Sequence, residues 1–254
     1  MDRPFTTGQI ARLYDLERQR GAGIHDLVQE LIRRLESGGV SPGTAQANGQ
    51  RRKGKGTKLT DRDPRILSHA KLLFDKGAGR EVGLPTFRDY LASIPDLPTF
   101  PEDYKTRFPL LALVDPRLTL TTSCRIFGVT LEGDDTTSVP SSDRVVTPTT
   151  PYWMSFQDGR IHDNRKPSDC RTEFLSRSDE LPLTALEGVS AYTQQHPSIL
   201  DGHMMDLPGS IRVDNGEHCA CLRRWGGGEI RLRWRWDGDP RPGCGSASRG
   251  GCIA

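Results

Sequence analysis

Residues 184–210, TALEGVSAYTQQHPSILDGHMMDLPGS, specify their own local structure more fully than any other part of the chain. Thr184 and Glu187 have the spacing of a capping box, in which each side chain bonds the backbone amide of the other residue. Apolar residues follow at helical spacing, and Pro197 ends the helix because the residue before a proline avoids the α region. We therefore expect a helix, a short turn and then an extended run that the Pro-Gly pair at 208–209 closes.

The same stretch contains two histidines and two aspartates, His196, Asp201, His203 and Asp206. If they converge, these side chains provide metal ligands or an acid/base pair. The alternative is that they cap the helix, form turns and bond the backbone. We favour the alternative, because no spacing among the four matches a known ligand pattern.

Composition and charge predict a folded body at residues 61–254 that follows a basic segment at residues 37–60. The 254 residues suit one large domain or a domain with a small appendage, and the net charge is only +2. Residues 37–60 carry five basic side chains and no acidic one, which leaves residues 61–254 with a net charge of −3. The sequence shows no positively charged start followed by an apolar core, so no secretory signal is expected, and it shows no apolar run of membrane-spanning length. We expect a cytoplasmic protein with reduced thiols and no membrane association.

Residues 1–36 predict a helical hairpin, whose second helix has a clean apolar stripe that ends at Gly38 and Gly39. Such a hairpin cannot bury its stripe alone, so it must pack on the body, on a copy of itself or on a partner. We expect it to recruit a protein partner. A DNA-reading helix-turn-helix is the weaker alternative, because acidic and basic side chains are mixed on the second helix.

Residues 37–60 are rich in Gly, Ser and Gln and predict a flexible linker. The basic cluster between Arg51 and Lys58 could bind nucleic acid, but it is short and has no aromatic residue on which a base could stack. A soluble tether is the favoured interpretation.

Residues 61–254 predict an α+β body in which antiparallel β-hairpins pack with short helices. Asp158 and Gly159 form a favoured hairpin turn pair after the strand at 152–157, which places His162 on the return strand. The Thr-rich run at 119–127 fits a helix or a strand, and we favour the helix because Thr119 and Gly128 suit its two ends. Further elements are expected as helices at 63–77, 86–93 and 168–175 and as a short apolar strand or core segment at 110–114.

Residues 229–237 alternate between apolar side chains and arginines without exception, which predicts a strand with one buried and one solvated face. A glycine turn joins it to a preceding strand at 218–225 in an antiparallel hairpin. Arg231, Arg233 and Arg235, with Arg223 or Arg224 beside them, could bind phosphate or another anion. A solvated sheet face is the commoner meaning of such a row.

His218, Cys219 and Cys221 are the best metal-ligand candidates, because Cys and His bind zinc well. The Cys-x-Cys pair needs further ligands, which His203, His162 or Cys244 could supply. The sequence contains no CxxC pair, so the expected state is a protein without cofactor, and zinc is the alternative.

Four segments, PYWMSFQDGR, LPLTALEGVSAY, HPSILDGHMMDLPGS and GSASR, resemble those of an uncharacterised family of conserved bacterial proteins of unknown function. The resemblance covers roughly residues 85–250 and omits the helical hairpin and the linker. It implies a bacterial cytoplasmic setting and carries no activity, fold or cofactor.

Two hypotheses on function follow, and the sequence leaves open whether the protein is an enzyme. In the first, the protein is a non-enzymatic binding protein whose helical hairpin recruits a partner and whose body holds a ligand near His162, His203 and the arginine row. In the second, it is a hydrolase-like enzyme that uses His203 and Asp206, with His162 at the same cleft and a metal as an option.

Overall fold

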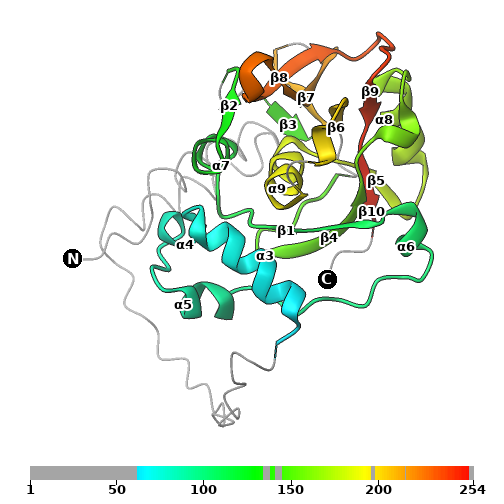
Figure 1. The fold of residues 1–254 in the computed structure, drawn as a ribbon. Helices are drawn as coiled ribbons and strands as arrows, with labels where there is room; N and C mark the ends of the chain where they lie inside the picture. The colour runs from blue at the N-terminus through cyan, green and yellow to red at the C-terminus, as the bar shows by residue number, and fades with distance from the viewer. Residues whose placement is uncertain (1–61, 134–137, 141–144, 196–197, 215, 252–254) are drawn as a thin grey trace, which may run out of the picture. The chain divides into compact units, whose positions relative to one another are not determined.

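A computed structural model describes residues 62–133, 138–140, 145–195, 198–214 and 216–251. The predicted helical hairpin at 1–36 and the predicted linker at 37–60 lie outside these residues. The described body is α+β, as predicted, and consists of two β-sheets with helices around and between them (Figure 1).

One sheet has four antiparallel strands and the other has six strands, of which two pairs are parallel. The four-stranded sheet has the order β1 (Leu110–Val114), β4 (Tyr152–Gln157), β10 (Ser248–Gly250), β5 (Glu180–Pro182). The six-stranded sheet has the order β2 (Val129–Leu131), β8 (Ile230–Trp236), β7 (His218–Arg224), β6 (Met204–Arg212), β3 (Ser138–Pro140), with β9 (Cys244–Ser246) also paired to β6.

Helix α9 (Ala185–Gln195) connects the two sheets, and its predicted capping box is confirmed. The backbone N of Thr184 donates to Glu187 Oε2 at 2.8 Å, and the backbone N of Glu187 donates to Thr184 Oγ1 at 3.4 Å. Gly188 lies against β6 so closely that a Cβ there would be 2.4 Å from Leu207. At the other end Gln194 bonds both the N and the O of Leu113 in β1, at 2.9 and 2.8 Å. The helix therefore buries one face on each sheet.

The other helices predicted for residues 61–254 are present. The run at 119–127, which fitted a helix or a strand, forms helix α7 (Leu120–Phe127). Thr119 accepts a hydrogen bond from the backbone N of Thr122 at 3.1 Å, and Gly128 has a φ of 74° at the other end. The helices are α3 (Pro64–Asp75), α4 (Ala78–Glu81), α5 (Phe87–Ala92), α6 (Tyr104–Arg107), α7 (Leu120–Phe127) and α8 (Pro167–Ser176), with 3₁₀ turns η3 (Arg160–His162), η4 (Ser198–Leu200) and η5 (Gly226–Gly228).

The hairpin predicted at Asp158 and Gly159 is wrong. Strand β4 pairs with β1 on one side and with β10 on the other, so no edge is free for a return strand. The chain instead turns into η3, and His162 lies on that 3₁₀ turn. Gly159 has a φ of 95°, and a Cβ there would be 2.2 Å from the carbonyl oxygen of Gly245. The chain does turn at Asp158 and Gly159, but it enters a 3₁₀ turn because β1 and β10 already occupy both edges of β4.

The expected end of the extended run at Pro208 and Gly209 is also wrong, because β6 continues to Arg212. The pairing of β6 with β7 changes register between Leu207 and Ile211, which accommodates the proline in the strand.

The alternation in β8 holds at first and then fails. Ile230 and Leu232 are buried as predicted, and Arg231 is half-buried. At the end of the strand Arg235 is only 8 % exposed whereas Trp236 is 45 % exposed, the reverse of the expectation. The face predicted to be solvated is covered there, because Arg235 pairs with a buried aspartate of β6.

Candidate functional site

That aspartate is Asp206, whose side chain has no exposed surface. Arg235 Nη1 donates to its two oxygens at 2.9 and 3.2 Å. Burial raises the pKa of Asp206 to about 7, and the charge of Arg235 opposes that rise. The pair is enclosed by the sheet and has the character of a structural contact.

His203 lies apart from this pair. Its Nε2 donates to the carbonyl oxygen of Asp158 at 2.9 Å, so the imidazole fixes the turn that follows β4. Burial lowers the pKa of His203 below its ordinary value, which keeps the ring neutral near pH 7.

His162 has a third environment. Its Nδ1 accepts a hydrogen bond from Arg165 at 3.1 Å, and its ring packs edge-on against Phe174 of α8 at 5.0 Å between centroids. Burial, followed by the positive charge of Arg165, lowers the pKa of His162. Both histidines thus hold the same turn, at residues 158–163, but within the described residues no hydrogen bond or ion pair joins His162, His203 and Asp206 to one another.

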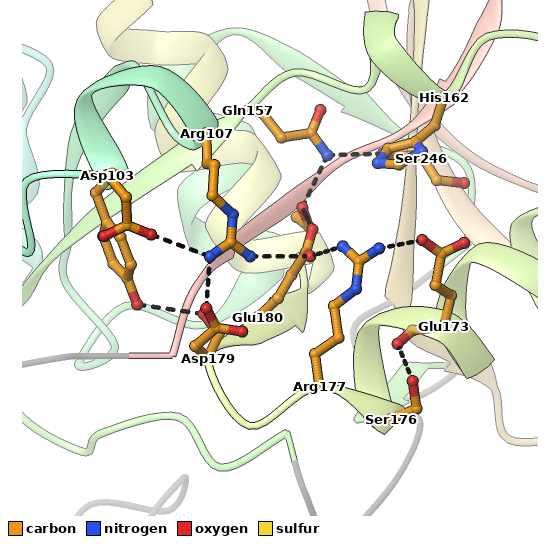
Figure 2. Close-up of polar contacts among 12 residues, drawn as sticks. Asp103, Arg107, Gln157, His162, Glu173, Ser176, Arg177, Asp179, Glu180 and Ser246 are labelled. Atoms are coloured by element: carbon orange, nitrogen blue, oxygen red, sulfur yellow. Dashed lines mark hydrogen bonds and ion pairs between the residues drawn. The ribbon is translucent and has the colours of Figure 1, made fainter.

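Near His162, Figure 2 shows a network of ion pairs in which Arg107 and Arg177 reach Glu180 from two sides. Glu180 is 3 % exposed, and its other oxygen accepts a 2.5 Å hydrogen bond from Ser248 Oγ. Arg107 also pairs with Asp179, and Arg177 pairs with a glutamate of α8, Glu173. Carboxylates outnumber the arginines in this network, so it fastens β5 to α6 and α8 and has no excess positive charge for an anionic ligand. This network was not predicted, because Arg107 lies 72 residues from Asp179 in the chain.

The proposed metal ligands point in different directions. The ring of His218 packs edge-on against that of Trp236, with 5.6 Å between the centroids. Cys219 and Cys221 lie on the opposite face of the sheet, which also carries Asp206 and Arg235. Burial raises the pKa of both thiols. No group of three or more His, Cys, Asp or Glu side chains that could hold a metal ion occurs within the described ranges.

The arginine row of β8 divides into two parts. Arg235 belongs to the buried pair with Asp206, whereas Arg231 and Arg233 are 29 % and 34 % exposed. The register of β7 and β8 places Arg223 directly opposite Arg231, and Arg224 pairs instead with Asp201 at 3.1 Å. We define the arginine face as Arg223, Arg231 and Arg233 together with Trp225 and Glu132.

The indole of Trp225 holds two of these arginines. The guanidinium carbon of Arg223 lies 4.1 Å from the ring centroid, and that of Arg231 lies 4.9 Å from it. Cation–π attraction offsets part of the repulsion between the two cations, which face each other across the strands. Trp225 is 39 % exposed, so the cluster is at the surface.

Carboxylates neutralise the arginine face only in part. Arg231 donates to Glu229 Oε2 at 2.9 and 2.8 Å. Glu132 lies 3.5 Å from Arg231 Nη1 and 3.7 Å from Arg233 Nε, too far for good hydrogen bonds. Among the described residues no carboxylate pairs with Arg223, and the Nε atoms of Arg223 and Arg233 have no acceptor. These two Nε atoms are buried, so an anion would bind through the other nitrogens of the guanidinium groups.

Sequence reasoning found Arg231 and Arg233 and left Arg223 open beside Arg224. It missed Trp225 and Glu132, although the strand register implied by the glycine turn could have placed Trp225 near the arginines.

Comparison with known proteins gave no relatives: no family model, curated protein or solved structure matches this chain. Within the part of the chain that the structure describes, every helix is too short or too polar to cross a membrane.

Proposed function

We propose that the protein is a non-enzymatic binding protein whose body holds an anionic ligand on the arginine face. The observation that carries this proposal is Arg223, a half-buried guanidinium without a carboxylate partner among the described residues. A partly desolvated cation without a counter-charge is unfavourable, and an anion bound from solvent would relieve that cost.

The balance of charge favours a compact ligand. Residues 61–254 carry a net charge of −3, so the arginine face is a positive patch on an acidic body. A small anion would interact mainly with the three arginines, whereas a long polyanion would extend beyond them onto a body whose net charge is negative.

We also propose that residues 1–36, which are predicted to form a helical hairpin, recruit a protein partner, and that the basic cluster at 51–58 does not bind nucleic acid. The proposed setting is the bacterial cytoplasm. Cys170, Cys219, Cys221 and Cys244 are buried and form no disulfide, which supports a reducing compartment.

The test is calorimetric titration of the full chain at low ionic strength with phosphate, sulfate, acetate, a short acidic peptide and a single-stranded oligonucleotide. We expect at least one anion to bind, with an affinity that falls at least tenfold in Arg223→Gln. The proposal is wrong if no anion binds, or if binding is the same in that variant. Turnover of an ester or phosphoester probe that is lost in His203→Ala would support the hydrolase hypothesis instead.

A further inference from the structure

Arg231 is the shared member of the arginine face. It lies with Arg223 on the ring of Trp225 and with Arg233 on the carboxylate of Glu132. A ligand that approaches Arg231 therefore meets a second guanidinium on either side. This inference rests on the proposed function and concerns the chemical class of the ligand.

Glu132 has a fixed backbone and a loosely held side chain. Its backbone N donates to the carbonyl oxygen of Leu232 at 2.9 Å, which extends the pairing of β2 with β8. Its side chain is 38 % exposed, and its two ion pairs are longer than normal hydrogen bonds. The carboxylate is thus an internal anion at the site that a stronger anion can displace without unfolding the strand.

Charge decides between ligand classes. The face has three arginines against the carboxylates of Glu132 and Glu229, which leaves one positive charge. A monocarboxylate that displaces Glu132 exchanges one single charge for another and leaves that excess in place. A dianion that displaces Glu132 neutralises two positive charges, namely the one that Glu132 had neutralised and the one that was in excess.

We propose that the ligand is a phosphate monoester or inorganic phosphate, bound as the dianion by Arg231 together with Arg223 and Arg233, and that Glu132 is the carboxylate it displaces. Guanidinium groups match the oxygens of phosphate in pairs, so three of them can satisfy a tetrahedral oxyanion. A phosphodiester carries a single charge on each phosphate and gains less at this site.

The experiment measures the dissociation constants of inorganic phosphate, phenyl phosphate and acetate for the full chain by calorimetry at pH 7.5 and low ionic strength. Quenching of Trp225 fluorescence, with Trp225→Phe as the blank, reports whether binding occurs at this face. We expect both phosphates to bind at least tenfold more tightly than acetate. Arg231→Gln should weaken phosphate binding at least tenfold, and Glu132→Gln should strengthen it severalfold.

Arg212→Gln is the matched control, because Arg212 pairs with Asp214 outside the arginine face and should leave phosphate binding unchanged. Urea midpoints of all variants establish that they are folded. Acetate binding as tight as phosphate, tighter binding of an oligonucleotide than of phenyl phosphate, or weaker phosphate binding in Glu132→Gln would each overturn the inference while anion binding itself stands. Absence of any binding that depends on the arginines would overturn the proposed function as well.

Discussion

Arg249 and Glu187 form an ion pair in which neither side chain has any exposed surface, with Arg249 Nε 2.6 Å from Glu187 Oε1. The same oxygen accepts a hydrogen bond from the hydroxyl of Tyr152 at 2.9 Å. The other oxygen completes the capping box with Thr184. One carboxylate therefore joins strand β10, strand β4 and the start of helix α9.

This pair predicts a large loss of stability when one partner is removed. Arg249→Met should lower the free energy of unfolding by about 3–5 kcal/mol, because the charge of Glu187 stays buried without its partner. Urea denaturation measures the change. The double variant Arg249→Met/Glu187→Gln should recover part of the loss, and equal losses in the single and double variants would contradict the account.

The contact between Gly159 and Gly245 predicts intolerance of a single methyl group. Gly245→Ala should destabilise the protein by about 1–3 kcal/mol, because the new Cβ would lie 2.0 Å from the carbonyl oxygen of Gly159. Gly226→Ala is the matched control, since nothing lies within 4 Å of a Cβ at that position. Thermal melts compare the two, and similar melting temperatures would argue against the close approach.

The two parts of the arginine row should differ in stability. Arg235→Ala is expected to cost about 3–5 kcal/mol, because it leaves the carboxylate of Asp206 buried and unpaired. Arg231→Ala should change stability by only about 0.5 kcal/mol or less, because the side chain is at the surface. Both values come from urea denaturation, and a small effect of Arg235→Ala would mean that Asp206 is neutral or hydrated.

The buried histidines predict a loss of stability in mild acid. Burial lowers the pKa of His162 and His203 in the folded state, so the unfolded chain binds more protons below its ordinary value of about 6.5. Their contribution to stability is complete above that pH and is lost as the pH falls toward the folded pKa. The contribution of the two histidines to the urea midpoint should therefore fall between pH 7.5 and 5, whereas the raised pKa of Asp206 acts in the opposite direction. It should fall less in His162→Gln, and an unchanged pH profile in that variant would exclude His162 as a cause.

The sequence at 37–60 predicts where a protease acts first. Limited trypsin digestion should cut initially after the basic residues between Arg51 and Lys58, because this segment has almost no apolar side chain to bury. Mass spectrometry of the first fragments identifies the site. Protection of all these positions would favour a docked basic arm.

Short sequence patterns correctly predicted the elements that depend on interactions between residues close in the chain. The capping box at Thr184, the helix at 119–127 and the strand at 110–114 are confirmed, because caps and short apolar periods act over a few residues. The turn at Gly159 and the buried end of β8 at Arg235 could not be inferred in the same way. Both depend on partners distant in the chain, namely Gly245 for the turn and Asp206 for the arginine.

The candidate site follows the same division. Strand alternation identified Arg231 and Arg233 as surface cations, and the structure separates Arg235 from them. Glu132 was not predicted, because it reaches the arginines through the parallel pairing of β2 with β8, and no local pattern in either segment indicates that pairing.

Strands β9 and β10 lie next to each other in the chain but belong to different sheets, and β10 is inserted between β4 and β5 (Figure 1). The ribosome makes residues 244–250 after every other strand of both sheets. A body that folded before they emerge would have a gap between β4 and β5 and would bury the charge of Glu187 without Arg249. The body is therefore expected to complete its folding only after synthesis of this segment, and nascent chains that stop short of it should be substrates for chaperones and proteases.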